Sequence, residues 1–205
     1  MLLGKRIAIF MFGMLLFSLG IAQAVQVKYL GIHPWEVLNV GLYEKFGLSI
    51  GTWSIIISVL LICVTLILDR SYIRIGTFLN AFLVGLFVDS WLKLGFLFPA
   101  GNNWTDMLLL LMSMALMGIG GGINNAARLG SGPRDGFMLS ISDKTHASIR
   151  KVRIVMETSV ILLGLLVGGP VFIFTFVYTF VQSPLFQLAF LKTEKLWLKD
   201  QQNSG

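Results

Sequence analysis

Long apolar runs, separated by charged or turn-forming residues, dominate the pattern of this chain. A membrane core about 30 Å thick requires about 20 consecutive apolar residues per spanning helix. Runs near that length occur at residues 7–27, 50–68, 75–92, 107–127, 152–167 and 171–191. The pattern predicts an all-α integral membrane protein with six transmembrane helices. The run at 152–167 is short and contains Glu157, but its helix can extend back through Ile149.

The composition supports this fold class. Of the 205 residues, 56% are hydrophobic and 13% are charged, and the mean hydropathy is +0.81. Soluble domains carry about 25% charged residues. No linker-like segment divides the chain, so we expect one transmembrane domain over residues 1–205 whose main partner is the lipid bilayer. The net charge is +6, but the basic residues stand between apolar runs and form no stripe, so no nucleic-acid partner is expected.

The positive charges are distributed unequally over the two predicted sides of the membrane. With six spans, three Lys or Arg residues fall on one side and thirteen on the side that carries both termini. Cytoplasmic loops are enriched in Lys and Arg. The counts therefore predict a multi-pass protein of the plasma membrane with both termini in the cytoplasm.

An internal repeat relates the two halves of the chain. The segment Leu-Gly-x-x-Pro-x-Glu at 30–36 matches Leu-Gly-x-x-Pro-x-Asp at 129–135. Each unit contains a span, a short loop helix and a helical hairpin, so we assign repeat one to residues 1–100, repeat two to 101–191 and a cytoplasmic tail to 192–205. Three spans are an odd number, so the second repeat must enter the membrane inverted.

The first apolar run also has features of a cleaved secretory signal. Lys5 and Arg6 precede it, and Ala22-Gln23-Ala24 stands near its end. The repeat favours a permanent helix, because this run has a counterpart at 107–127.

Glycines and polar residues gather where the fourth run ends. Gly118 and the triplet at 120–122 precede Asn124, Asn125 and Arg128. Two interpretations stay open: close packing through a small-x-x-x-small spacing, or a broken helix that lines a polar cavity.

The following segment, Gly132-Pro133-Arg134-Asp135, predicts the start of a short helix with Pro133 in its first turn. Free N–H groups there, together with Arg134, can hold an anion. Alternatively, Arg134 pairs with an acid such as Asp135 or Glu157.

Glu157 is the ionisable residue expected deepest in the membrane, where a charge must pair, protonate or face a cavity. Arg153 lies four residues earlier on the same helical face, so we expect these two residues and Arg134 to form one polar cluster. The candidate substrate-binding residues are Asn124, Asn125, Arg128, Arg134, Asp135, Arg153 and Glu157.

We expect no enzymatic activity, no catalytic residues, no metal site and no cofactor. Phosphate-loop, zinc-protease and serine-hydrolase motifs are missing from the sequence. His33 and His146 both fall in predicted loops without an acid or cysteine at ligand spacing.

The segment 129–135, followed by Arg150, Arg153, Glu157 and the Gly168-Gly169 pair, resembles the bacterial YczE-like membrane proteins, which are relatives of the YitT group. The resemblance covers nearly the whole chain. It implies a bacterial plasma membrane and a role in transport or, for some members, in supporting secondary-metabolite production.

Two functions remain under consideration. The first is a small-solute transporter or permease, in which the inverted halves surround a path for a small polar or anionic solute. The second is a non-transporting accessory protein that binds a membrane-associated protein partner through its basic cytoplasmic loop, residues 128–153.

Overall fold

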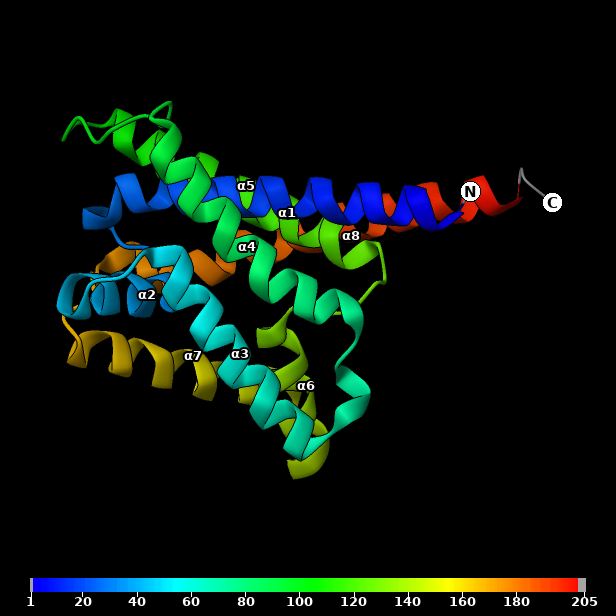
Figure 1. Ribbon diagram of the computed structural model, residues 1–205. Coiled ribbons are helices and arrows are strands. Elements are labelled where there is room, and N and C mark those ends of the chain that lie inside the picture. Colours follow the sequence, from blue (N-terminus) through cyan, green and yellow to red (C-terminus); the bar gives the residue numbers. More distant parts are fainter. Residues whose placement is uncertain (1, 203–205) are drawn as a thin grey trace.

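The computed structural model describes residues 2–202, and its regular elements are helices (Figure 1). In this described range, eight α-helices are joined by turns and by two single turns of 3₁₀ helix, η1 (Lys28–Leu30) and η2 (Arg70–Tyr72). The α-helices are α1 (Leu2–Gln26), α2 (Pro34–Phe46), α3 (Ile50–Leu68), α4 (Ile75–Leu94), α5 (Thr105–Ala126), α6 (Pro133–Thr145), α7 (Ile149–Leu166) and α8 (Ile173–Gln202). The predicted short helices after the first and fourth runs are present as α2 and α6.

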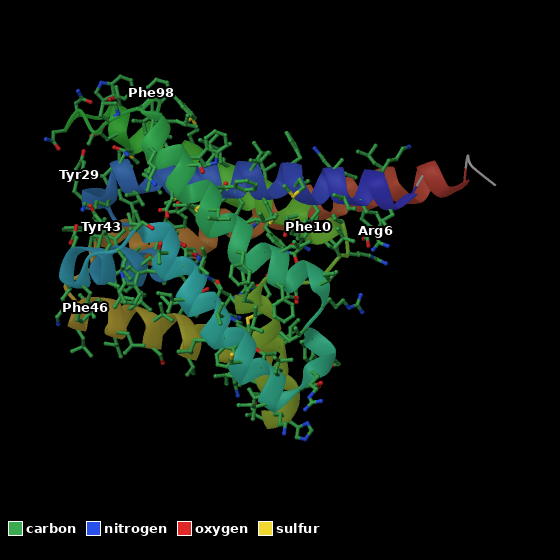
Figure 2. All side chains as sticks on the ribbon, in the orientation of Figure 1. Arg6, Phe10, Tyr29, Tyr43, Phe46 and Phe98 are labelled. Carbon is green, nitrogen blue, oxygen red and sulfur yellow. The ribbon has the colours of Figure 1, made fainter. Side chains whose placement is uncertain are left out.

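Helix α5 forms the centre of the bundle, because it packs along α1 on one side and along α8 on the other. Helix α4 crosses α1 and pairs with α3. Phe10 and Met14 of α1 pack with Met114 and Met117 of α5 in the buried core. Figure 2 shows Phe10 within the bundle, and Figure 1 shows both chain termini at the same end.

Close backbone contact explains the glycines of α5, which runs unbroken through them. A Cβ atom on Gly120 would lie 2.7 Å from the carbonyl oxygen of Gly13 in α1. A Cβ atom on Gly122 would lie 2.4 Å from the carbonyl oxygen of Phe186 in α8. The glycines therefore let two neighbouring helices approach α5 on different faces, which is the close-packing interpretation.

The short helices cross between the halves of the chain. Helix α2 packs against α7, and α6 packs against α3. Each is preceded by a Leu-Gly turn that contacts the last hairpin of the other half. Gly31 (φ +110°) lies against Thr175 at the start of α8, and Gly130 (φ +153°) lies against Thr77 at the start of α4. Side chains rarely adopt such φ values, and a Cβ on either glycine would come within 2.8 Å of the threonine nitrogen.

The side chains of these threonines have equivalent roles. Thr77 Oγ1 accepts a hydrogen bond from the Arg74 N–H at 3.2 Å, and Thr175 Oγ1 accepts one from the Phe172 N–H at 3.3 Å. Each threonine thereby satisfies a backbone donor at a helix start. The Gly76 N–H donates to the Leu129 carbonyl at 3.2 Å, which fixes one of the two crossed contacts directly.

Within the described residues, five helices are long and apolar enough to cross a membrane: Leu3–Gln26, Ile50–Leu68, Ile75–Leu94, Thr105–Ala126 and Ile173–Leu196. The protein is therefore an all-helical membrane protein with several apolar helices in contact with the bilayer. Helix α7 begins at Ile149 as expected, but it carries four charged residues in 18, which keeps it out of this set. That α7 also spans the membrane, as the sixth of six spans in number, stays a prediction.

The predicted C-terminal tail is in large part a continuation of α8. This helix extends past residue 191 to Gln202, so residues 192–202 are helical. Residues 203–205 of the predicted tail lie outside the described residues.

Candidate functional site

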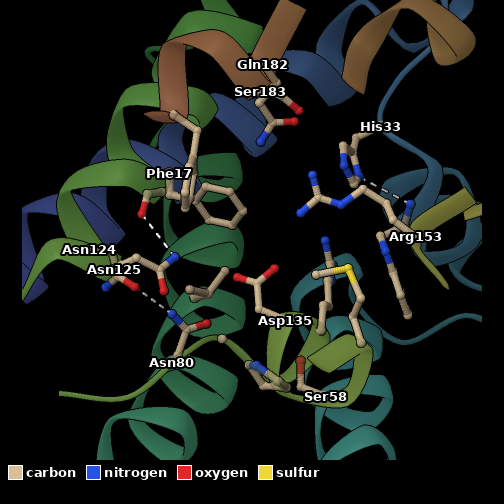
Figure 3. Close-up of a pocket in the computed structure, with 18 of the residues that line it drawn as sticks. Phe17, His33, Ser58, Asn80, Asn124, Asn125, Asp135, Arg153, Gln182 and Ser183 are labelled. Carbon is tan, nitrogen blue, oxygen red and sulfur yellow. Dashed lines mark hydrogen bonds between the residues drawn. The ribbon is translucent and has the colours of Figure 1, made fainter. Parts of the chain in front are cut away.

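A cavity of about 400 Å³ opens between the two halves of the chain. Its walls come from α1, α3, α4, α5, α7 and α8, and from the first residues of α2 and α6. Figure 3 shows many polar side chains turned into this space. Both halves of the chain contribute to it, so its shape depends on how the halves are arranged.

The starts of the two short helices meet beside the cavity. Both begin with proline in the first turn, Pro34 in α2 and Pro133 in α6. Arg134 Nη2 donates to Glu36 Oε1 at 3.0 Å, and the Arg134 guanidinium lies 4.9 Å from the centre of the Trp35 ring. This ion pair joins the first turn of α6 to the first turn of α2.

Glu36 itself is shielded from solvent, with its side chain 1% exposed. Its second carboxylate oxygen accepts a hydrogen bond from Asn39 Nδ2 at 2.8 Å. A buried carboxylate is costly unless it is paired and hydrogen-bonded. Here Arg134 and Asn39 supply both conditions, so Glu36 anchors the cavity wall from behind.

Asp135 of α6 and Arg153 of α7 both line the cavity (Figure 3). Burial raises the pKa of Asp135, while Arg153, Arg134 and a hydrogen bond from Asn125 act in the opposite direction. Burial, assisted by the charges of Arg134 and Arg153, lowers the pKa of His33 to about 3. The imidazole is therefore neutral at physiological pH.

An amide-rich wall faces these charges. Asn80 Nδ2 donates to Asn124 Oδ1 at 3.1 Å, and Asn124 Nδ2 donates to the Phe10 carbonyl at 3.0 Å. Asn125 Nδ2 donates to the Gly121 carbonyl at 3.2 Å. These bonds fix the orientation of the amides, so the wall presents donors and acceptors at defined positions.

The structure brings most of the predicted site residues together. Asn124, Asn125, Arg134, Asp135, Arg153 and Glu157 all line the cavity. Arg134, Arg153 and Glu157, which were expected to form one cluster, thus line the same cavity.

Arg128 lies elsewhere. It has a positive φ of 54°, and its guanidinium pairs with Glu194 of α8. Its carbonyl accepts a hydrogen bond from Arg6 Nη2 at 2.9 Å, at the end of the bundle where Figure 2 labels Arg6. Arg128 therefore belongs to a contact between chain ends and not to the cavity.

Arg134 pairs with an acid, as one of the two interpretations of its segment expected, but the acid is not one of the two examples given there. Asp135 and Glu157 are near it in the sequence or in the expected cluster, but the ion pair is made with Glu36, nearly half the chain away. The signal that could have found Glu36 is the repeat itself, because Glu36 aligns with Asp135. His33, Trp35 and Asn80 are further lining residues that the sequence analysis did not assign to a site.

Metal-binding side chains are not clustered in the described part of the chain. No group of three or more His, Cys, Asp or Glu residues there has an arrangement that could hold a metal ion.

Comparison with known proteins finds one family and several bacterial relatives, one of which is named a membrane protein. Residues 4–190 match the model of the family of unknown function DUF6198. "Uncharacterized membrane protein YczE" of Bacillus subtilis is 34% identical over 78% of this chain and 73% of its own length. An "Uncharacterized protein" of Haemophilus influenzae is 34% identical over 82% and 75%, and "Uncharacterized protein YyaS" of Bacillus subtilis is 31% identical over 78% and 79%. No solved structure matches significantly.

Proposed function

The chain belongs to the DUF6198 family, and from that premise we propose that it is a small-solute transporter or permease of the bacterial plasma membrane. The observation that carries the proposal is the polar cavity between the halves, which holds Asp135, Arg153 and Glu157. Charged groups within a membrane protein are expensive and concentrate along solute and ion pathways. The proposal includes no enzymatic activity.

The crossed contacts support a pair of inverted repeats. Gly31 against Thr175 and Gly130 against Thr77 are matching contacts made by matching residues, and the packing of α2 on α7 matches that of α6 on α3. Two equivalent halves of this kind give a transporter two related arrangements, each open to one side of the membrane.

In the proposed topology α7 also spans the membrane, which gives six spans, and both termini are cytoplasmic. Arg153 and Glu157 of α7 line the cavity, so they can reside at membrane depth without facing lipid. The excess of Lys and Arg on the side of the termini supports the orientation.

The cavity gives a direct test of transport. Ser58 on α3 lines it and is 7% exposed, whereas Leu60 on the same helix is 60% exposed and points outward. Purified protein in liposomes should speed osmotic swelling by at least one small polar solute from a panel of anions, cations, zwitterions and neutral compounds. Ser58→Trp should abolish this flux by filling the cavity, and Leu60→Trp should preserve it. If no solute enters faster than through protein-free liposomes, or if both variants behave alike, the proposal is wrong.

One observation favours the alternative, an accessory protein that binds a membrane-associated partner. Lys144, Arg150 and Lys151 are all exposed around the turn from α6 to α7, which forms a basic surface on the predicted cytoplasmic side. In a deletion strain with altered metabolite output, an accessory role predicts rescue by Ser58→Trp and failure of rescue by Lys144→Glu. A transporter gives the opposite result.

A further inference from the structure

The ionised groups of the cavity differ in how well they are already paired. Glu36 neutralises Arg134 through the 3.0 Å contact. For Arg153, no hydrogen bond or ion pair joins the guanidinium to another residue in the described range, although it lines the cavity and acts on Asp135 and His33 through its charge. Asp135 is acted on by the charges of Arg153 and Arg134 and by the Asn125 amide, against the effect of burial on its pKa. The cavity therefore presents a cationic donor group and a separate carboxylate to a bound solute.

Helix direction strengthens this separation of charge. The first turns of α2 and α6 both border the cavity, through His33, Trp35, Pro133 and Arg134. A helix N-terminus carries a partial positive charge. Arg153 and these helix starts make one part of the cavity favourable to an anion, while the carboxylate of Asp135 makes the neighbouring part favourable to a cation.

A solute with only one sign of charge leaves half of this arrangement unsatisfied. A simple anion would bind at Arg153 but would be repelled by Asp135 and Glu157. A simple cation would bind at Asp135 but would leave Arg153 beside the positive ends of two helices. Buried charges that lack a partner are destabilising, so the cavity favours a solute that carries both signs.

Resting on the proposed function, we infer that the solute is a small zwitterion, whose anionic group binds Arg153 and whose cationic group binds Asp135. The volume of about 400 Å³ lies in the lower part of the range for small-molecule sites, roughly 300–1,000 Å³, and suits a solute of amino-acid size. Trp35 and Phe17 supply apolar surface in the same cavity for the uncharged part of the solute.

Binding to the purified full-length protein tests this inference without requiring transport. The probes are alanine, proline and trimethylglycine, each measured by calorimetry and by thermal shift beside counterparts that lack either the amine or the carboxylate. For alanine these counterparts are propionate and ethylamine. At least one zwitterion should bind at least tenfold more tightly than both of its counterparts.

Two variants separate the two halves of the recognition. Arg153→Gln should weaken zwitterion binding at least tenfold and leave the affinity for the amine-only counterpart unchanged or stronger. Asp135→Asn should also weaken zwitterion binding, but it should improve the relative affinity for the carboxylate-only counterpart. Arg128→Gln, which changes a guanidinium outside the cavity, should bind like the unaltered protein.

Three results would overturn the inference. The first is equal binding of a zwitterion and one of its counterparts, and the second is equal weakening of every probe by both variants. The third is no zwitterion binding to protein that is monodisperse and helical by circular dichroism. The same probes in liposomes distinguish this failure from failure of the proposed function. Zwitterion binding without flux refutes transport alone, whereas flux of a simple anion or cation refutes the zwitterion alone.

Discussion

Replacement of Glu36 tests the connection between the two short helices. Its buried carboxylate accepts hydrogen bonds from Arg134 at 3.0 Å and from Asn39 at 2.8 Å. Glu36→Gln keeps the shape of the side chain and removes its charge. The Arg134 guanidinium then remains beside the cavity without a carboxylate, and the contact that joins α2 to α6 is weakened.

The magnitude follows from the burial of the two partners. Removing one member of a buried ion pair costs about 3–5 kcal/mol, and a hydrogen bond to a charged group contributes about 1.5–3 kcal/mol. The Arg134 side chain is 20% exposed, so solvent can recover part of the loss, and glutamine keeps one acceptor. We therefore expect the free energy of unfolding to fall by about 2 kcal/mol. For a chain of this length that lowers Tm by about 4–8 °C.

Thermal unfolding in detergent, followed by circular dichroism, measures this change. A double-mutant cycle with Arg134→Gln should give a coupling energy of at least about 1 kcal/mol, because the residues are in direct contact. Glu44→Gln is the matched control: Glu44 pairs with Lys28 at the surface, where its side chain is 42% exposed, and should change stability by less than about 1 kcal/mol. Equal effects of Glu36→Gln and Glu44→Gln, or additivity within about 0.5 kcal/mol in the cycle, would refute the reasoning.

Three further predictions concern pH, burial and packing. Folding lowers the pKa of His33 from 6.5 to about 3, so the contribution of His33 to stability is complete above pH 6.5 and is lost as the pH falls from there towards 3. His33→Gln should remove this pH dependence, which is at most about 1.4 kcal/mol of unfolding free energy per pH unit. Tm measured against pH tests this, and an unchanged profile contradicts it. Folding raises the pKa of Asp135, so its contribution to stability is complete below the ordinary pKa of an aspartate and is lost as the pH rises through the pKa in the folded protein. Asp135→Asn should therefore raise Tm at pH 7. A lower Tm would show that the pairing of Asp135 outweighs its burial. Gly120→Ala places a Cβ 2.5 Å from the Phe17 nitrogen and should lower Tm markedly. Gly4→Ala, whose Cβ would have no atom within 4 Å, should leave Tm unchanged or raise it. Similar Tm values for both variants would mean that α1 and α5 are not in close contact.

Local sequence chemistry predicted the elements better than their partners. Proline in the first turn predicted the short helix at Pro133 because its fixed φ and missing N–H suit that position. The short helix at Pro34 was predicted from the match between the two halves. Polar residues inside apolar runs predicted the cavity lining at Asn124 and Glu157 because the membrane tolerates such groups only there. The arguments from proline and from polar residues use forces that act within a few residues of the position concerned.

Pairing across the chain could not be predicted in the same way. Arg134 has several acids within plausible reach, and only the crossed packing of α2 selects Glu36. Arg128 does not line the cavity and pairs with Glu194 of α8 instead, a contact between distant parts of the chain that no local residue pattern signals. The status of α7 as a span is open for a similar reason: its charges are acceptable in the membrane only if they face the cavity, which is a property of the assembled halves.

The crossed packing of the short helices has a consequence for the order of folding during translation. Helix α2 leaves the ribosome early, but its packing partner α7 begins at Ile149. Until Arg134 has been synthesised, the buried carboxylate of Glu36 has no ion-pair partner, and until α7 follows, α2 has no packing partner. Contacts so distant in sequence form slowly, because a long loop must close before they bring any gain. The first half of the protein therefore waits in the membrane as an incomplete intermediate, and native structure forms only when nearly the whole chain has been inserted.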